Sequence, residues 1–422
     1  MNKANKFFSI IFTITFLHAV GEAGAIFLLI APGAGAAGTG EAQVAKADDA
    51  YASYYNPAGL GFLSGSEAAG MHVNWLPNLA DDIYYDFLTY RKQIDGIGSF
   101  GAHLIFLNLG SQVQTDAEGN ELGNFNSNMW AITTSLGTSL NKTSSIGVGF
   151  KIIQQNLGPG AGAEANEGKS TDFLFDLGYL KKFSFGNLGV SVTNIGPKIW
   201  FQDQTQADPA PTNMRMGVFS NLYDDGFNKI NFMMDANKLL VSRYQQMDWN
   251  GDGIISGDDE QEHDDPWYTA IFTSWLDDWY YGGDYNKDDD LRIGGYNWYD
   301  CGGGLCADDE AWDPSLGDGN IDEDELHPTL DENGDFLSFN DPDYGYYGQC
   351  ASDTSPEDCI EKGSGDNRSF TTELEEMVYN FGAEYWYTDN FVIRGGYIYD
   401  KEGKIKKEKL MMGIFVEFST IL

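Results

Sequence analysis

The residues best suited to chemistry lie in an acidic loop of twelve residues. Oxygen ligands fall at its positions 1, 3, 5, 7, 9 and 12 and glycine stands at position 6, the spacing of an EF-hand-type or dockerin-type calcium loop. The predicted ligands are Asp248, Asn250, Asp252, Ile254 through its carbonyl, Ser256 and Asp259. We therefore expect a structural calcium ion here, with a merely solvated acidic loop as the alternative.

Three further stretches carry part of the same spacing. The first has an aspartate where glycine belongs, the second lacks both the glycine and the closing acid, and the third supplies only the later half of a loop. Their candidate ligands are Asp284, Asn286, Asp288 and Asp290; Asp331, Asn333 and Asp335; and Asp318, Asp322 and Glu325. For these stretches an acidic surface is as good an interpretation as metal binding.

The acidic residues are concentrated in one region of the chain. Residues 241–370 contain 34 Asp and Glu against 5 Lys and Arg, which supplies −29 of the formal net charge of −39. Binding to nucleic acid needs clustered Lys and Arg, so this composition excludes nucleic acid as a partner. It favours cations instead, because so many unneutralised carboxylates would repel one another.

All four cysteines lie in the same acidic region, and a predicted export signal bears on their oxidation state. The first residues combine Lys3 and Lys6 with an apolar run and a small-residue cleavage site, which predicts a signal peptide over residues 1–25. An even number of cysteines in an exported chain predicts disulfides, with all three pairings open. The cysteines are Cys301, Cys306, Cys350 and Cys359.

The acidic region also contains two predicted helices. Apolar residues recur with helical spacing and predict one apolar stripe, for which Asp265 is a plausible N-cap and Pro266 the first helical residue. The stripe consists of Tyr268, Ile271, Phe272, Trp275, Leu276 and Trp279. We expect this stripe to pack on a neighbouring part of the protein rather than to form an exposed docking face. A short second helix is expected from Ser355 to Gly363.

Outside the acidic region the pattern is that of membrane-spanning strands. Apolar and small or polar residues alternate, as in Ile146 to Ile152 and Leu188 to Thr193, which suits a wall with one face toward lipid and one toward a polar lumen. Twelve strands are predicted at residues 66–76, 82–92, 98–109, 124–138, 144–156, 169–182, 186–195, 211–222, 228–239, 378–387, 390–400 and 408–419.

The connections between these strands alternate in length. Tight turns at 94–96, 141–143, 184–185 and 224–226 alternate with longer loops at 110–123, 157–168 and 196–210. Outer-membrane barrels have short periplasmic turns and long extracellular loops, so the acidic region, which joins the ninth and tenth strands, is expected to be extracellular. The alternatives are a soluble β-sandwich or a solenoid.

The segment before the first strand resembles a known family. FLLIAPGAGAAGTGEAQVAKADDAYASYYNPAGL, from Phe27 to Leu60, is similar to the N-terminal signature of the PorV/PorQ family, which is related to the FadL barrels. The shared element is Asn56, Pro57, Ala58 and Gly59. Later blocks at 272–275, 379–387 and 394–397 extend the resemblance over most of the predicted barrel, but not over the acidic insertion as a whole.

The resemblance implies an all-β fold, a transmembrane antiparallel β-barrel of the FadL type with fourteen strands and an N-terminal segment folded into the lumen as a hatch. The expected organisation is a signal peptide (1–25), the hatch (26–63), a first part of the barrel (64–240), the acidic insertion (241–370) and a second part of the barrel (371–422). Twelve predicted strands, and the ending Thr420-Ile421-Leu422 without a terminal aromatic residue, fit either a sequence truncated before a last strand pair or a strand count that is short.

The family also implies a function. Its members belong to the type IX secretion system, where they accept cargo proteins with a C-terminal signal domain and deliver them to sortase-like surface attachment machinery. The sequence contains none of the nucleophile, phosphate-loop or zinc signatures of an enzyme, so we expect a non-enzymatic carrier in the outer membrane, in contact with its lipid. The alternatives are a FadL-like channel for hydrophobic small molecules and a barrel that anchors a surface adhesin.

Overall fold

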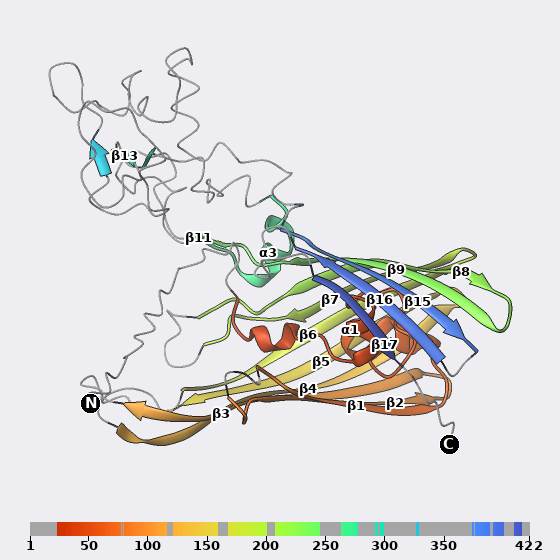
Figure 1. The fold of residues 1–422 in the computed structure, drawn as a ribbon, viewed down its shortest axis with the longest axis horizontal. Helices are drawn as coiled ribbons and strands as arrows, with labels where there is room; N and C mark the ends of the chain where they lie inside the picture. The colour runs from red at the N-terminus through yellow and green to blue at the C-terminus, as the bar shows by residue number, and fades with distance from the viewer. Residues whose placement is uncertain are drawn as a thin grey trace, which may run out of the picture.

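A single antiparallel sheet of twelve strands dominates the computed structural model (Figure 1). The structure describes residues 23–76, 78, 80–115, 121–158, 168–200, 207–244, 263–276, 292–293, 296–298, 326–328, 374, 376–388, 391–400 and 409–415. The strands of the large sheet are β1 (Ser66–Asn74), β2 (Tyr84–Ile94), β3 (Gly98–Thr115), β4 (Glu121–Asn141), β5 (Ser144–Gly158), β6 (Gly168–Phe183), β7 (Gly186–Ile195), β8 (Asn213–Asp224), β9 (Asn228–Leu239), β15 (Val378–Tyr387), β16 (Phe391–Tyr399) and β17 (Lys409–Phe415).

Each strand of this sheet pairs with the next one along the chain. The order runs from β1 to β9 and continues with β15, β16 and β17, so the long insertion after β9 leaves the strand order intact. All twelve predicted strands are confirmed, with ends shifted by a few residues. The largest difference is between β3 and β4, which extend into the predicted loop 110–123 after a register shift between Asn108 and Ser111.

The sheet curves into a barrel wall whose two ends differ, as the turn lengths predicted. Short turns join β2 to β3, β4 to β5, β6 to β7, β8 to β9 and β15 to β16 at one end, here named the short-turn end. The remaining connections leave from the opposite, long-loop end. Among the described residues, β1 and β17 each pair with only one neighbouring strand.

The two faces of the wall carry different side chains. In β5 the exposed residues Ile146, Val148 and Phe150 alternate with the buried residues Gly147 and Gly149. The same alternation places apolar side chains on the outer face of the neighbouring strands; they include Leu136, Phe173, Phe175, Leu177, Leu188, Val218, Phe232 and Ile393. An apolar outer face of this kind is suited to lipid.

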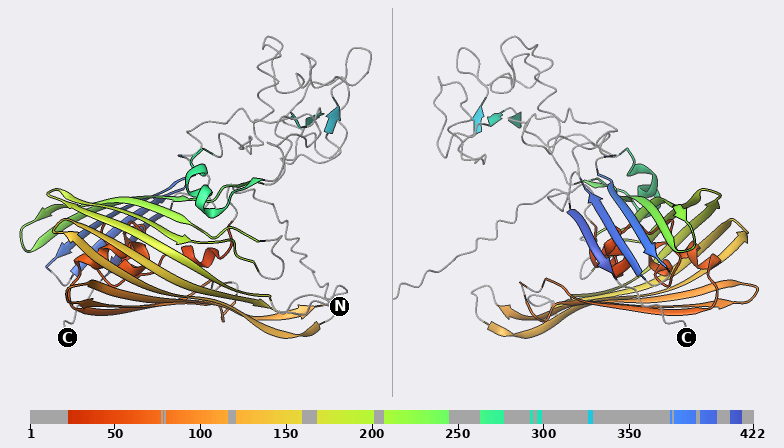
Figure 2. Two further views of the ribbon diagram at one scale, coloured as in Figure 1. Left: turned by 180° about the vertical axis from the view of Figure 1, so that it is seen from behind. Right: turned by 45° about the vertical axis from the view of Figure 1, so that its right-hand side comes forward.

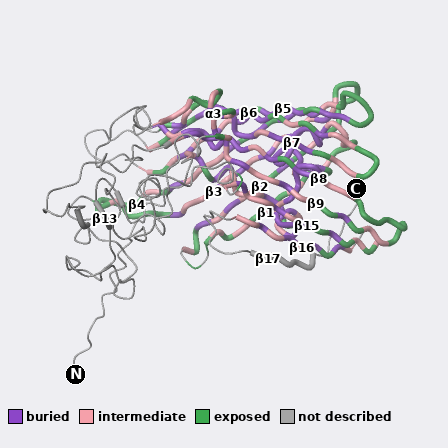
Figure 3. The backbone as a smooth tube through the Cα atoms, turned by 90° about the horizontal axis from the view of Figure 1, so that it is seen from above, coloured by how far each residue is buried: buried purple, intermediate pink, exposed green. Residues whose placement is uncertain are grey.

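The expected hatch lies on the concave side of the curved sheet (Figure 2). It contains short helices only: η1 (Ile26–Leu29), α1 (Ala34–Gly38), α2 (Ala52–Tyr55) and η2 (Pro57–Phe62). Most of its residues are buried, whereas the turns at the ends of the strands are exposed (Figure 3). The core of the molecule is therefore the contact between the hatch and the inner face of the wall.

Small elements follow β9. The hairpin β10 (Arg243–Tyr244) and β11 (His263–Asp264) leads into helix α3 (Trp267–Thr273), and β12 (Arg292–Ile293), β13 (Tyr296–Trp298) and β14 (Leu326–Pro328) form a separate sheet. The predicted helix is thus confirmed at its start, with Pro266 rather than Asp265 at the N-cap position. None of the helices in the described part of the chain has the length and apolarity of a membrane span.

Candidate functional site

The inner face of the wall is small and polar where it meets the hatch. The inward positions Gly147, Gly149, Lys151, Ser191 and Thr193 are all buried, as the alternation predicted. A Cβ atom added at several inward glycines would overlap hatch atoms: Gly147 lies against Pro57, Gly178 against Asn56, Gly189 against Val44 and Gly396 against Gly40. These glycines let the hatch backbone approach the wall more closely than a side chain would permit.

The Asn-Pro-Ala element forms one of these contacts. Asn56 is fully buried and caps η2 by accepting a hydrogen bond from the Ala58 amide (3.1 Å), while Pro57 occupies the first helical position, where its missing N–H is harmless. The Asn56 amide group donates to the carbonyl oxygens of Val44 (2.9 Å) and of Tyr179 in β6 (3.1 Å). The element therefore joins two parts of the hatch to the wall.

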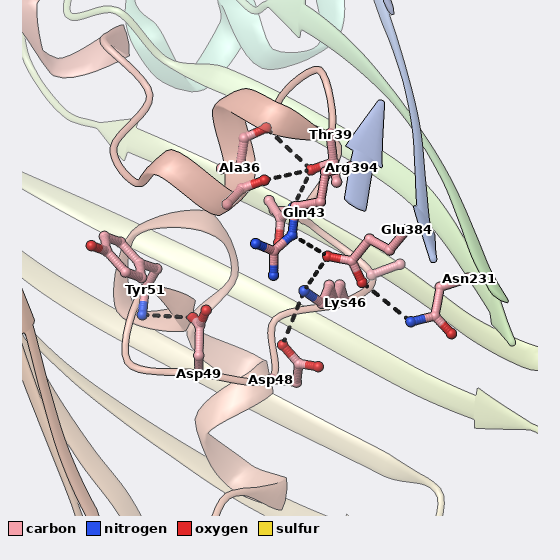
Figure 4. Close-up of polar contacts among 12 residues, drawn as sticks. Ala36, Thr39, Gln43, Lys46, Asp48, Asp49, Tyr51, Asn231, Glu384 and Arg394 are labelled. Atoms are coloured by element: carbon pink, nitrogen blue, oxygen red, sulfur yellow. Dashed lines mark hydrogen bonds and ion pairs between the residues drawn. The ribbon is translucent and has the colours of Figure 1, made fainter. Parts of the chain in front are cut away.

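A buried carboxylate joins the hatch to the last strands. The Glu384 side chain in β15 accepts hydrogen bonds from Lys46 of the hatch (3.0 Å), from Arg394 of β16 (2.9 Å) and from Asn231 of β9 (3.2 Å) (Figure 4). It also accepts one from Trp386 (3.1 Å). Its side chain has no exposed surface, and that of Arg394 is 6% exposed. A buried carboxylate needs such partners, because isolated charges are costly away from water.

The charge of Lys46 is secured by more than one carboxylate. Burial lowers the pKa of Lys46, but the nearby carboxylates of Asp48, Glu384 and Asp49 outweigh it and hold the pKa above its ordinary value. The pKa of Asp49 is also raised, to about 6, by burial first and by the neighbouring Asp48 carboxylate second. Asp49 nevertheless keeps a hydrogen bond from the Tyr51 amide (2.8 Å).

A second buried carboxylate binds hatch backbone. The Asp235 side chain in β9 accepts hydrogen bonds from the amides of Gln43 (2.6 Å) and Val44 (2.8 Å). On the adjacent strand, the Asn380 side chain donates to the Gly40 carbonyl (2.5 Å). The middle of the hatch, which has little regular structure to satisfy its own amides and carbonyls, thus finds partners on β9 and β15.

The other strands contact the hatch through an apolar cluster. Tyr54 packs edge to face on Tyr55 and on Phe87, with ring centroids 4.9 and 5.9 Å apart, and its hydroxyl donates to the Leu28 carbonyl (3.0 Å). Fully buried wall residues complete the cluster: Tyr85, Ile105, Ala131, Ile153 and Leu174. The described part of the lumen is therefore occupied by packed hatch and wall side chains.

Beside this cluster the wall holds its own buried ion pair. Lys151 of β5 is bonded to Asp176 of β6 (3.2 Å) and to Asn194, whose backbone amide donates to the same Asp176 oxygen (2.8 Å). Asn194 has a φ of 61°, a left-handed conformation that asparagine tolerates better than most residues. Lys151, predicted only as an inward polar residue, thus has a defined partner.

The predicted calcium ligands and cysteines lie outside the described residues. What the structure does place is the hairpin that brackets the segment with the strongest loop: Arg243 pairs with Asp264 and Tyr244 with His263. Arg243 also forms an ion pair with Asp208 (2.6 Å), and Lys198 forms one with Asp264. The residues on either side of segment 245–262 are therefore held together at the long-loop end of the wall.

Sequence reasoning missed Lys46, Asp235 and Glu384 as contact residues. Each carboxylate occupies an inward position of its strand, between outward apolar neighbours such as Ala383 and Tyr385. An isolated charge at an inward position was the available signal, because a buried charge requires a partner. The identity of the partner depends on the path of the hatch through the lumen, which local patterns do not specify.

The chain was compared with solved structures and with curated proteins. Similar solved structures include the Ralstonia pickettii toluene transporter TbuX, at 11% identity with 90% of this chain and 87% of that chain covered and a TM-score of 0.39. The Pseudomonas putida toluene transporter TodX gives 12% identity, coverage of 87% and 83%, and a TM-score of 0.36. A Pseudomonas aeruginosa FadL homologue gives 10% identity, coverage of 87% of this chain and 80% of that chain, and a TM-score of 0.35. The comparison with curated proteins gave no match.

A comparison with family models is more direct. The model described as type IX secretion system protein PorV matches residues 18–246, which is more than half of the chain. The matched segment includes the hatch, the Asn-Pro-Ala element and strands β1 to β9, and it ends at the start of the acidic insertion. This chain belongs to the PorV family of type IX secretion system proteins, and it is an outer-membrane component of that system.

Proposed function

We propose that this protein is a non-enzymatic carrier of the type IX secretion system that receives the C-terminal domain of secreted cargo at its long-loop end. The observation that carries this proposal is the occupied lumen, in which the hatch is bound to the wall by buried polar contacts. A folded cargo domain cannot share that space with the hatch. The long-loop end, which we propose faces the cell exterior, is the remaining surface for a protein partner.

The energetic cost of moving the hatch supports a plug that remains in place. Withdrawing the hatch would take Lys46 away from Glu384 and would strip Asp235 of both amide donors, those of Gln43 and Val44. Breaking a buried ion pair costs about 3–5 kcal/mol when one partner is left behind. A channel for hydrophobic molecules that opened by hatch movement would have to supply this energy in every cycle.

The acidic insertion leaves the wall at the same end. We propose that it is held on the exterior, fastened by disulfides among its four cysteines, and that it offers cargo or the sortase-like attachment machinery a calcium-stabilised surface. The ligands proposed are those of the loop from Asp248 to Asp259. Its affinity should be on the order of 0.1–1 mM, as in extracellular calcium modules.

The experiment is a gentle detergent purification of the full chain from native outer membranes, followed by mass spectrometry of proteins and lipids that co-purify. Recovery of several exported proteins that share one C-terminal domain would support the carrier. An abundant outer-membrane protein purified from the same membranes is the control for adventitious capture. Stoichiometric hydrophobic ligand without protein partners would instead overturn the carrier in favour of a channel.

A matched variant tests whether the insertion takes part. Because Tyr244 and His263 are paired, replacing residues 245–262 by a short turn removes the strongest calcium loop while preserving the ends of the hairpin. Unchanged cargo recovery with this variant would assign binding to the wall loops. Loss of cargo with retained surface expression would assign it to the insertion.

A further inference from the structure

Helix α3 differs in composition from the acidic region around it. No Asp, Glu, Lys or Arg occurs between Pro266 and Leu276, although this stretch belongs to the insertion that carries most of the negative charge of the chain. A surface helix exposed to water normally has one apolar and one charged face. A helix without charged residues on any side is typical of an environment that is not water.

One face of this helix packs on the protein. Ala270 and Ser274 are 3% and 1% exposed, and the ring of Trp275 lies beside the Lys238 ammonium group of β9, 5.8 Å from its centroid. Lys238 is in turn bonded to Glu376 (2.6 Å). The predicted packing of the apolar stripe on the barrel rim is therefore correct for its Trp275 edge.

The opposite face carries large apolar side chains that remain uncovered. Tyr268, Phe272 and Leu276 follow one another at intervals of four residues and are 61%, 75% and 46% exposed; Trp267 beside them is 41% exposed. Tyr268, Phe272 and Leu276 thus form an apolar ridge along α3 and the turn after it, on the side that points away from Ala270 and Ser274. For this edge of the stripe the predicted packing is wrong.

The position of α3 indicates what covers the ridge. In β9, Asn237 faces inward and is bonded to Asn380, so the next residue, Lys238, occupies the outer face. The preceding outward residue, Ala236, pairs with Tyr379, whose ring lies near that of Tyr399. Because Trp275 contacts Lys238, helix α3 lies on the outer side of the wall at the long-loop end of β9 (Figure 1). The Tyr379 and Tyr399 rings belong to the same outer face.

We propose that α3 is an interfacial anchor, lying at the boundary between lipid acyl chains and headgroups with Tyr268, Phe272 and Leu276 in contact with lipid. Trp and Tyr are enriched at this depth because their rings are apolar and their polar tips reach water. Asp264, which directly precedes the helix, forms ion pairs with Lys198 and Arg243. The anchor would hold the start of the acidic insertion against the membrane surface.

The test uses the full chain in phosphatidylcholine vesicles, with an environment-sensitive fluorophore on one introduced cysteine and a spin-labelled lipid as quencher. Phe272→Cys is the reporter. Phe175→Cys, on the outer face of β6, is the positive control, and Lys142→Cys, in an exposed turn, is the aqueous control. Labelling of the unsubstituted protein gives the background from its own cysteines.

The anchor predicts a distinct depth for each label. The label at position 272 should be quenched at least twofold more by lipid with a spin label near the headgroup than by lipid with one near the chain end. The label at 175 should show deeper quenching, and the label at 142 almost none. Quenching at 272 as weak as at 142, with 175 still quenched, would overturn the proposal and leave a protein partner as the occupant of the ridge.

Discussion

The inner and outer faces of the barrel wall obey different rules although they belong to the same strands. On the outer face, large apolar side chains face lipid, and neighbouring positions are interchangeable as long as they stay apolar. On the inner face, glycines and a few charged residues each meet one particular hatch atom, as Gly396 meets Gly40 and Glu384 meets Lys46. The outer face therefore requires only apolar residues that suit lipid, whereas each inner residue requires one particular hatch atom as its partner.

The largest expected effect comes from removing the buried Glu384 carboxylate on the inner face. Glu384→Gln removes the buried carboxylate that Lys46 and Arg394 share and should lower the free energy of unfolding by about 3–5 kcal/mol. Urea unfolding in lipid vesicles measures it. The control is Glu67→Gln, because the Glu67 side chain in its ion pair with Arg91 is 36% exposed, whereas that of Glu384 has no exposed surface; the expected loss is about 0–1 kcal/mol. Equal losses of stability in the two variants would contradict the distinction between the buried and the partly exposed ion pair.

Substitutions on the outer face should destabilise the protein through unfavourable contact with lipid rather than through the loss of a specific partner. Val148 is 50% exposed on the outer face of β5, so Val148→Lys places a charge against lipid and should cost about 2–4 kcal/mol if the residue lies near the bilayer centre. Val148→Ala should cost much less. Stability measured in the same vesicle assay checks both variants, and a tolerated lysine would argue against a lipid-facing surface at this position.

Two adjacent glycines sharpen the comparison. A Cβ at Gly396 would overlap the Gly40 backbone, whereas at Gly395 no heavy atom of the described residues lies within 4 Å. We expect Gly396→Ala to destabilise the protein by about 1–3 kcal/mol through overpacking, and to increase proteolysis of the hatch. Gly395→Ala should leave both unchanged. Because only Gly396 faces the hatch, a difference in stability between the two variants reports on packing against the hatch and not on contact with lipid.

The smallest effect concerns the pH dependence of the hatch. Because the pKa of Asp49 is raised to about 6 from an ordinary 3.8, the folded state keeps a proton that the unfolded state loses between these values. The contribution of Asp49 to stability should therefore fall as the pH rises from about 4 to 6 and stay level above. Asp49→Asn should remove this contribution and, because Asp49 is only partly buried, raise stability at pH 7.5 by on the order of 1 kcal/mol.

A matched variant distinguishes burial from the neighbouring charge. Asp48→Asn removes the nearby carboxylate but leaves Asp49 in its buried position, so a reduced slope should persist. A full slope in Asp49→Asn itself would show that another group titrates in this range. Thermal unfolding in detergent over pH 4–8 provides the measurement.

The same contrast explains how much the sequence could predict. Alternation such as that from Ile146 to Phe150 predicts strands and outer positions because lipid acts on every outward residue alike. The partners of Glu384 and Asp235 could not be predicted, because they lie in a hatch more than 180 residues away and depend on strand register and on the hatch path together. Helix α3 lies between these cases: its existence was predictable, but not which edge of the stripe the wall would cover.

The most direct test locks the hatch to the wall during secretion. The Ser53 and Thr89 hydroxyl oxygens are 3.2 Å apart, so Ser53→Cys with Thr89→Cys permits a disulfide, or a short bifunctional thiol link, between hatch and β2. Cargo release at the cell surface is then compared with that of the single Ser53→Cys variant and the unsubstituted protein, with cross-linking verified by mass spectrometry. A carrier with a fixed hatch predicts undiminished cargo release when cross-linked. Loss of release on oxidation and recovery on reduction, seen only in the double variant, would contradict the account.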